Sequence, residues 1–557
     1  MAATFSDSLA SFYLAFPLIP EIDIMEKSAG DRKSSDQFLG SGLSRRTFMQ
    51  TALAAGMSLY ASDQLWAQQV ASTPRKGGTL RLVCDGGGAT DTMEGKASSG
   101  ADHITCVQSS VYDTLVFPTA EGSVQSNLAE SWSSSSDGRT WEFKLKKGVE
   151  FHNGKSLTAS DVVWSLSQHA VPGAKNGDGR NIVGNFESIR ADDSNTVIIV
   201  QKEANRDLPI QLSAYALLVA PEGTANWNEP GRGTGPYMIE SFEPGVRFIG
   251  KKFQNFHRED QGWFDSVDVG CVLESATRTN ALMTGAADVI GNPEPKTAKR
   301  LSKVGGKVLE VVPSGQHFLT AMRCDADPFT NEDLRLAIKY GIKRQEIVDK
   351  VLYGYGYVGN DHPIGKNYQY YNPDLEQREF DPEKARFHAK KSGYGGGVLE
   401  LKVSDGIVSG SVAYGQLMQA TLRDVGINVE VKTVPADGYF SNVWLKTPWC
   451  ASYQNPRPTA DWILTNGYSS KSPFNDSGFN SPALDKLLSS ARGEADDQKR
   501  RQMYYEAQRI VRDGAGNTVL AFANFLIGST DRMGHGPIGA QRRLDDARLT
   551  RKWWFKT

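Results

Sequence analysis

One short stretch of the chain combines charged side chains with aromatic rings. Arg457 could hold a carboxylate or phosphate through two parallel hydrogen bonds, and Asp461 could accept a cation or a hydroxyl group. Aromatic rings in this region could stack on a sugar or hold a cation on their faces. The rings are Tyr439, Phe440, Trp444, Trp449, Tyr453 and Trp462. We predict a polar pocket wall here. The alternative is a surface loop with a local Arg457–Asp461 pair, with some of the rings packed in the core.

The common signatures of catalysis and metal binding are absent from the sequence. The eight His residues are scattered, with no HExxH and no two-His-plus-acid spacing. No GxSxG motif occurs, and the Gly-rich loop at 85–88 lacks the Lys-Ser/Thr pair of a P-loop. We therefore expect no catalytic residues, no metal and no cofactor, and we interpret His152 as a structural residue.

The amino-acid composition of the chain limits the classes of partner that it is expected to bind. Lys and Arg total 62 and Asp and Glu total 64, a net charge of −2, which is untypical of nucleic-acid binders. No run of 18 apolar residues occurs, so no transmembrane helix is expected. The five Cys residues form no CxxC motif, and an odd number leaves at least one thiol without an intramolecular partner. Which thiols pair, if any, is open.

The N-terminus has the pattern of an export signal. A twin-arginine core, SRRTFM at 44–49, precedes a mildly apolar run at 51–60 and small residues at Ala67 and Ala71. We predict that residues 1–67 are an N-terminal extension and a signal peptide, recognised by the twin-arginine translocase and then removed. No Cys lies near the end of the apolar run, so we expect a soluble periplasmic protein without a lipid anchor. Met25, rather than Met1, is a candidate for the true start.

The elements that would position these residues alternate between strand and helix. From about 310 to 450 strand patterns such as LELKV at 399–403 alternate with helical ones, which predicts an α/β domain. The stretch 119–204 has more strand and hairpin signals, which favours a separate small domain. Within it, Trp141, Phe143 and Leu145 alternate as inward residues of a strand, and Thr158 and Asp161 have the spacing of a capping box at a helix start.

Several motifs occur in an order that identifies a family. They are LAESW at 128–132, DGRTWEFKL at 137–145, GVEFHNG at 148–154, LTASDVV at 157–163, GTGPY at 233–237 and PFTNEDLRLAIKY at 328–340. DKLL at 485–488 and the helical segment ending at Arg512 follow. Together they resemble the family 5 extracellular solute-binding proteins, which are the dipeptide-, oligopeptide- and nickel-binding components of ABC importers. The resemblance covers residues 77–557.

The resemblance implies a two-lobed periplasmic binding protein fold of the cluster C type, with a small domain inserted in lobe I. Lobe I would comprise 77–118, 205–312 and 516–557, the small domain 119–204, and lobe II 313–515. The chain crossings near 312 and 516 would form the hinge. Closure of the lobes would enclose the ligand and create the surface that the permease recognises.

The resemblance also implies where the ligand binds. Peptide-binding members carry an Asp that pairs with the peptide ammonium, in a Trp-Cys-Ala-Asp segment, and Ser452 stands at that position here. This departure leaves peptides, opines and sugar conjugates open as ligands. The predicted ligand-binding residues are Gly87, Gln316, His317, Tyr439, Trp444, Trp449, Ser452, Tyr453, Asn455, Arg457, Asp461 and Trp462.

The function implied is capture of a small polar solute for an ABC importer, with permease and ATPase subunits as partners and a monomer as the oligomeric state. A ligand sensor or chaperone with the same fold is the alternative, and a periplasmic enzyme is a third hypothesis.

Overall fold

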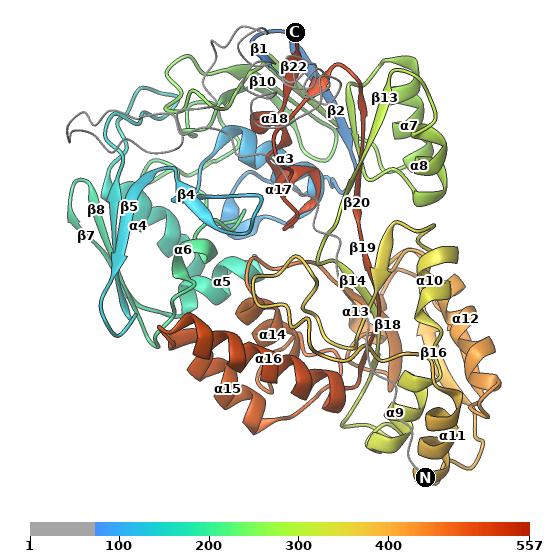
Figure 1. Cartoon of the computed structure of the whole chain (residues 1–557). Helices are drawn as coiled ribbons and strands as arrows, with labels where there is room; N and C mark the ends of the chain where they lie inside the picture. The colour runs from blue at the N-terminus through green and yellow to red at the C-terminus, as the bar shows by residue number, and fades with distance from the viewer. Residues whose placement is uncertain (1–72) are drawn as a thin grey trace, which may run out of the picture. The chain divides into compact units, whose positions relative to one another are not determined.

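The computed structural model describes residues 73–557, which contain two large β-sheets (Figure 1). The predicted twin-arginine segment and the two candidate start residues lie outside the described residues. The first sheet has seven strands, in the order β13 (Lys307–Val312), β20 (Phe525–Thr530), β12 (Val289–Gly291), β2 (Thr79–Cys84), β11 (Ser266–Cys271), β10 (Arg247–Lys252) and β9 (Tyr237–Glu243).

Helices cover both faces of the first sheet, and successive side chains of β2 pack against them on opposite faces. Leu80, Leu82 and Cys84 pack in one core with helix α3 (Asp102–Val111), whereas Val83 packs on the other face against α7 (Ser275–Thr284) and α8 (Pro295–Leu301). The chain ends nearby in α17 (Arg543–Ala547), α18 (Leu549–Lys552) and a three-stranded sheet of β1 (Pro74–Arg75), β22 (Trp554–Lys556) and β21 (Met533–Gly534).

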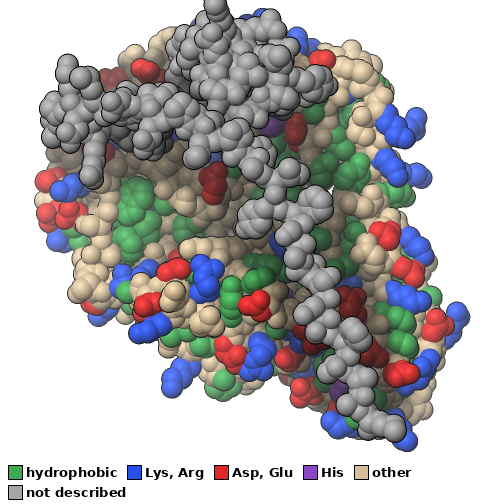
Figure 2. Space-filling view, viewed as in Figure 1, with side chains coloured by type: hydrophobic (Ala, Val, Ile, Leu, Met, Phe, Trp, Pro, Cys, Tyr) green, Lys and Arg blue, Asp and Glu red, His purple; other side chains and the backbone are tan. Residues whose placement is uncertain are grey.

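The second sheet has six strands, in the order β15 (Gly356–Val358), β19 (Asn517–Ala523), β14 (His317–Met322), β18 (Trp449–Gln454), β16 (Leu399–Val403) and β17 (Val429–Thr433). Its helices are α9 (Glu332–Tyr340), α10 (Arg344–Lys350), α11 (Pro382–Lys391), α12 (Ser411–Arg423), α13 (Tyr439–Asn442), α14 (Ala460–Tyr468), α15 (Pro482–Gly493) and α16 (Asp497–Gly514). On the face shown in Figure 2, acidic and basic side chains intermingle over α15 and α16 without a patch of one sign.

A smaller four-stranded sheet lies in the predicted insertion, in the order β5 (Ala129–Ser134), β6 (Thr140–Leu145), β8 (Thr196–Gln201) and β7 (Phe186–Asp193). With it are β3 (Val116–Pro118), β4 (Val124–Ser126), α4 (Ala159–Ser167), α5 (Gly177–Gly184) and α6 (Leu208–Gln211). Trp141, Phe143 and Leu145 alternate inward from β6, and the capping box of Thr158 and Asp161 starts α4, both as predicted. The core of this region also includes Trp462 of α14.

A continuous antiparallel ribbon connects the two large sheets. β13 pairs with β20 in the first sheet, and β14 pairs with β19 in the second. Between them, the Ala523 N–H donates to the Gln316 carbonyl at 2.8 Å, and the Ser314 hydroxyl donates to the Ala523 carbonyl at 2.7 Å. The chain therefore crosses between the sheets twice, at 313–316 and at Asn524.

The second crossing differs from the prediction. We placed the lobe boundary at 516, but β19 belongs to the second sheet and all seven of its residues are buried there. β19 and β20 form one apolar stretch interrupted by Asn524, so the sequence alone does not mark where one sheet ends. The other domain boundaries remain predictions.

Two further observations concern the described residues. No helix among them is long and apolar enough to cross a membrane. All five Cys residues lie in this part of the chain and all are unpaired, with Cys84 and Cys106 fully buried.

A buried ion pair joins distant parts of the first lobe. Arg551 of α18 donates from Nη2 to Asp113 at 2.7 Å, and the same carboxylate accepts hydrogen bonds from Asn127, Thr234 and His257. The surrounding positive charge and donors lower the pKa of Asp113 well below its usual range, although burial opposes this.

We expect Arg551→Met to lower the free energy of unfolding by about 3–5 kcal/mol, because Asp113 would be left buried without its cation. Urea unfolding measures this. The matched control is Arg509→Met on α16, whose exposed pair with Glu506 should contribute no more than about 1 kcal/mol. Equal effects of the two variants would contradict the prediction.

Candidate ligand-binding cleft

A cavity of about 560 Å³ opens between the two large sheets. From the first lobe it is lined by the end of β2, the loop before α3, and the segment before α17; from the second lobe by the crossing segment, the loop after β16, and the end of β18. The principal lining residues are Asp85, Asp102, Asn292, Gln316, Asp405, Tyr453, Asn455, Arg542 and Arg543. Its volume lies in the range of small-molecule sites in proteins.

An acidic side chain of the first wall is held with one oxygen unsatisfied. Asp85 accepts a hydrogen bond from Asn292 at 3.0 Å and pairs with the buried Arg278 at 3.3 Å, both through Oδ2. Asp85 Oδ1 is buried and has no partner. This oxygen is available to a donor on a ligand.

Two arginines of the first wall are positioned by an unusual turn. Residues 544–547 all have positive φ, between 56° and 60°, a conformation costing roughly 1–2 kcal/mol per residue. Asp546 helps to hold the turn by accepting backbone hydrogen bonds from Gln541 and Arg542. Strained backbone of this kind is concentrated at functional sites, and here it lies directly after the cavity-lining Arg543.

Arg543 also connects the two walls. Its guanidinium pairs with Asp102 of the first lobe at 3.2 Å and donates to Gln316 of the crossing segment at 3.3 Å. Gln316 in turn donates to Asn455 at the end of β18, at 2.8 Å. The two lobes therefore already contact each other through polar side chains that line the cavity.

A second pocket of about 320 Å³ adjoins the cleft and shares Tyr453 and Asn455 with it. Its lining is aromatic, with Tyr439, Phe440, Trp444 and Phe474, together with Ser452, Gln454 and Asp476. Burial raises the pKa of Asp476 to about 6, against the opposing effect of three hydrogen-bond donors.

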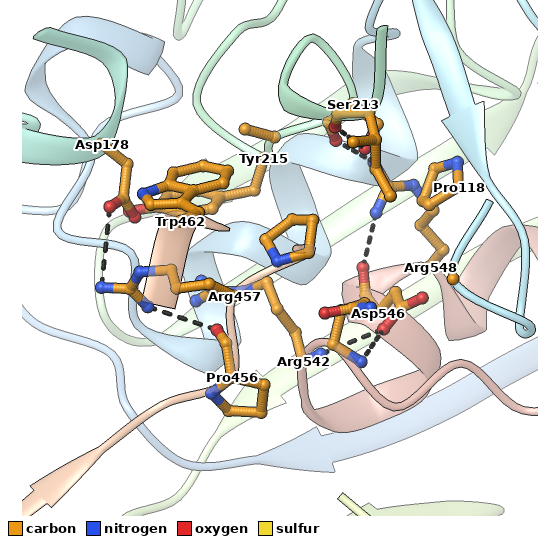
Figure 3. A pocket seen from close by; sticks show the side chains of 15 residues that line it. Pro118, Asp178, Ser213, Tyr215, Pro456, Arg457, Trp462, Arg542, Asp546 and Arg548 are labelled. Atoms are coloured by element: carbon orange, nitrogen blue, oxygen red, sulfur yellow. Dashed lines mark hydrogen bonds and ion pairs between the residues drawn. The ribbon is translucent and has the colours of Figure 1, made fainter. Parts of the chain in front are cut away.

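A third, smaller cavity of about 40 Å³ is lined by Arg457, Arg542 and Arg548 (Figure 3). Arg457 faces Asp178 of α5 with 3.6 Å between Nη2 and Oδ1, and Arg548 donates to the Ser213 carbonyl at 3.0 Å. Trp462 and Tyr215 close this cavity.

Most of the predicted residues of the second lobe line these spaces. Gln316, Tyr453 and Asn455 line the large cavity, and Tyr439, Trp444, Ser452 and Arg457 line the adjoining pocket. Whether they contact the ligand remains a prediction.

Other predicted residues lie elsewhere. Trp449 is fully buried and packs edge-on against Phe329 in the core of the second lobe. His317 is also fully buried, and burial lowers its pKa to about 4 while its Nδ1 lies 3.0 Å from the Gly315 carbonyl oxygen. Gly87 lies beside the cleft-lining Asp85 and Gly86 but packs against Cys271.

Asp461 and Trp462 lie in the first turn of α14 and do not line the large cavity, although Trp462 lines the small cavity beside Arg457. Asp461 accepts a hydrogen bond from Arg492 of α15 at 2.9 Å, not from Arg457. The local Arg457–Asp461 pair considered as an alternative does not form. His152 packs as expected of a structural residue, with its Nε2 2.9 Å from the Gly235 carbonyl oxygen.

Four further residues line these spaces and were not predicted from the sequence: Asp102, Asp476, Arg542 and Arg543. Asp476 stands in a polar turn, Asn-Asp-Ser-Gly, that reads as an ordinary loop, and the arginines stand in a charged run near the C-terminus. Only the tertiary fold brings them to the cleft. Among residues 73–557, no group of three or more His, Cys, Asp or Glu side chains is arranged to hold a metal ion.

Comparison with known proteins agrees with this architecture. The model of the bacterial extracellular solute-binding proteins, family 5, matches residues 123–485, more than half of the chain. The chain belongs to this family.

A family 5 relative is the glutathione-binding protein GsiB of Pectobacterium atrosepticum, which is 27% identical over 409 residues, 68% of this chain and 77% of that protein. Two solved structures show the same two-lobed fold. The Helicobacter pylori protein DppA, in complex with the peptide STSA, has a TM-score of 0.74 at 22% identity and covers 87% of this chain and 99% of its own. AgaA from A. tumefaciens R10, in complex with agropinic acid, has a TM-score of 0.73 at 20% identity over 86% and 99%.

We expect Arg457→Ala to weaken ligand binding about tenfold or more with little change in the melting temperature of the free protein, because a hydrogen bond to a charged group contributes about 1.5–3 kcal/mol. Isothermal titration calorimetry and thermal unfolding measure the two effects.

Asp461→Ala is the matched variant. It should lower the melting temperature and leave ligand binding unchanged, because the Asp461 carboxylate neutralises Arg492 outside the cleft. Unchanged affinity in Arg457→Ala would remove Arg457 from the site.

Proposed function

We propose that this protein captures a small polar solute between its two lobes and delivers it to the permease of an ABC importer. The observation that carries the proposal is the cavity of about 560 Å³ whose walls come from both large sheets, between which the chain crosses twice in the ribbon. A site divided between two lobes couples ligand binding to lobe closure, because only the closed form completes the contacts.

The lining supports a ligand with both hydrogen-bond donors and a negatively charged or carbonyl group. The unsatisfied Asp85 Oδ1 requires a donor, and Arg543, which is half-buried, can offer its guanidinium to a carboxylate. The relatives described above bind glutathione, a peptide and agropinic acid. Peptides, opines and sugar conjugates therefore remain the proposed ligand class.

The rest of the proposal concerns the cellular setting. The twin-arginine pattern supports export through the twin-arginine translocase to the periplasm and cleavage of the signal peptide. The family resemblance supports a soluble monomer that binds the ligand without catalysis. The family supports permease and ATPase subunits as partners. A ligand sensor with the same fold is the second candidate, and growth on the identified solute in strains lacking the permease separates the two.

The decisive experiment is mass spectrometry of the solute released from protein purified from its own periplasm. Recovery of one solute class at a stoichiometry near one per protein, and its rebinding by calorimetry, is the expected result. A protein that neither carries nor binds any peptide, opine or sugar conjugate contradicts the proposal.

We expect Arg543→Met to weaken binding of that solute by about 10–100-fold, since one charged hydrogen bond contributes about 1.5–3 kcal/mol. Calorimetry with Arg501→Met as the control, a partly exposed Arg on α16 outside the cleft, measures the difference. Equal affinities would exclude Arg543 from the binding site.

A further inference from the structure

The aromatic pocket beside the cleft contains a buried carboxylate without a cation. Asp476, between α14 and α15, is 4% exposed and lines this pocket. Trp444 Nε1 donates to its Oδ1 at 2.6 Å, and Ser452 Oγ and Gln454 Nε2 each donate to its Oδ2 at 3.2 Å. All three donors are neutral, and none of the ion pairs among residues 73–557 includes Asp476.

A second acceptor beside Asp476 is also unsatisfied. Gln454 directs its amide N–H towards Asp476, and its Oε1 is buried with no partner. The opposite amide orientation would place Oε1 against the carboxylate, so the hydrogen bond fixes the orientation. A carboxylate can accept about four hydrogen bonds and Asp476 accepts three. The two side chains thus offer unused acceptor oxygens to a ligand that donates hydrogen bonds.

The rings of the pocket favour a positive charge on that ligand. Trp444 lies between two other rings, 5.8 Å from Phe440 and 6.4 Å from Phe474, measured between ring centroids. Aromatic faces attract cations, and exclusion of water by the rings strengthens the attraction of a cation to the carboxylate. Among the described residues, Arg457 is the only Lys or Arg whose side chain lines the pocket, and it is directed towards Asp178.

We propose that this pocket binds a protonated primary amine or guanidinium group of the transported solute, with Asp476 as its counter-ion and Gln454 Oε1 as its second acceptor. This rests on the proposed function, which it narrows to solutes with a cationic N–H group. Because the pocket shares Tyr453 and Asn455 with the cleft, the cationic group occupies the pocket while the rest of the solute lies in the large cavity.

The proposal predicts that binding of the cation weakens as the pH falls. In the free protein the pKa of Asp476 is about 6, whereas a bound cation stabilises its ionised form. The titratable groups that face it are Tyr439, Tyr468 and Cys450, and burial raises the pKa of each further above 7, so all three stay neutral over this pH range. Arg457 also lines the pocket. Affinity for a cation should therefore fall about tenfold from pH 7.5 to pH 5, as Asp476 is protonated.

The test uses n-butylammonium as a probe and the Trp444 indole N–H as a reporter, because that N–H bonds directly to Asp476. In nitrogen-15 spectra of the full-length mature protein, the resonance is assigned by its loss in Trp444→Phe. We expect saturable shifts with n-butylammonium, at least tenfold weaker binding of the neutral n-butanol, and weaker binding of tetramethylammonium, which has no N–H. Equal binding of n-butanol and n-butylammonium would overturn the proposal.

Asp476→Asn should abolish the shift with n-butylammonium while raising the melting temperature of the free protein at pH 7.5, because it removes a buried charge without a cation. The control is Asp437→Asn, an exposed residue before α13, which should leave both properties unchanged. Unaltered binding in a folded Asp476→Asn protein would overturn the proposal.

The transport function and the cation subsite can be refuted independently of each other. A released solute without an amine or guanidinium group would refute the subsite and leave the transport function intact. A protein that binds n-butylammonium as expected but carries no solute would support the subsite and contradict the transport function.

Discussion

The antiparallel ribbon that crosses between the sheets is the constraint on which the rest of this structure depends. Its two chains supply strands to both large sheets, and they are hydrogen-bonded to each other at the crossing through Ser314, Gln316 and Ala523. A ribbon of two strands is weakly supported by side-chain packing outside its sheets, so bending is least costly there. The cleft and the ribbon are therefore connected, since Gln316 both lines the cavity and belongs to the crossing.

Some side chains near the cleft pack in the core, whereas others line the cavities. Trp449 and Cys450 are adjacent on β18, yet their side chains pack in separate clusters on the two faces of the sheet, because successive side chains of a strand alternate. Ser452 and Tyr453 then reach the open end of the same strand, where the pocket and the cleft meet. One strand thereby supplies both the core of the second lobe and a wall of the site.

Features that depend on neighbours in the chain are predictable from the sequence. The alternation of Trp141, Phe143 and Leu145 and the capping box at Thr158 depend on neighbours in the chain, and both were predicted. The course of β19 and the positions of Asp476 and Arg543 depend on contacts between residues far apart in sequence. No local pattern separates a buried loop carboxylate from a solvated one, so those features required the fold.

The relation between Ser452 and Asp476 shows how a site can keep its charge while its sequence motif changes. The resemblance to peptide-binding members led us to expect a carboxylate at position 452, where this chain has a hydroxyl. The structure places the Asp476 carboxylate 3.2 Å from that hydroxyl, although it is supplied by the loop before α15 rather than by β18. An Asp at both positions would bring two buried carboxylates together, which raises the pKa of one of them strongly. A hydroxyl at 452 avoids that repulsion and donates to Asp476, so the serine is complementary to the relocated charge.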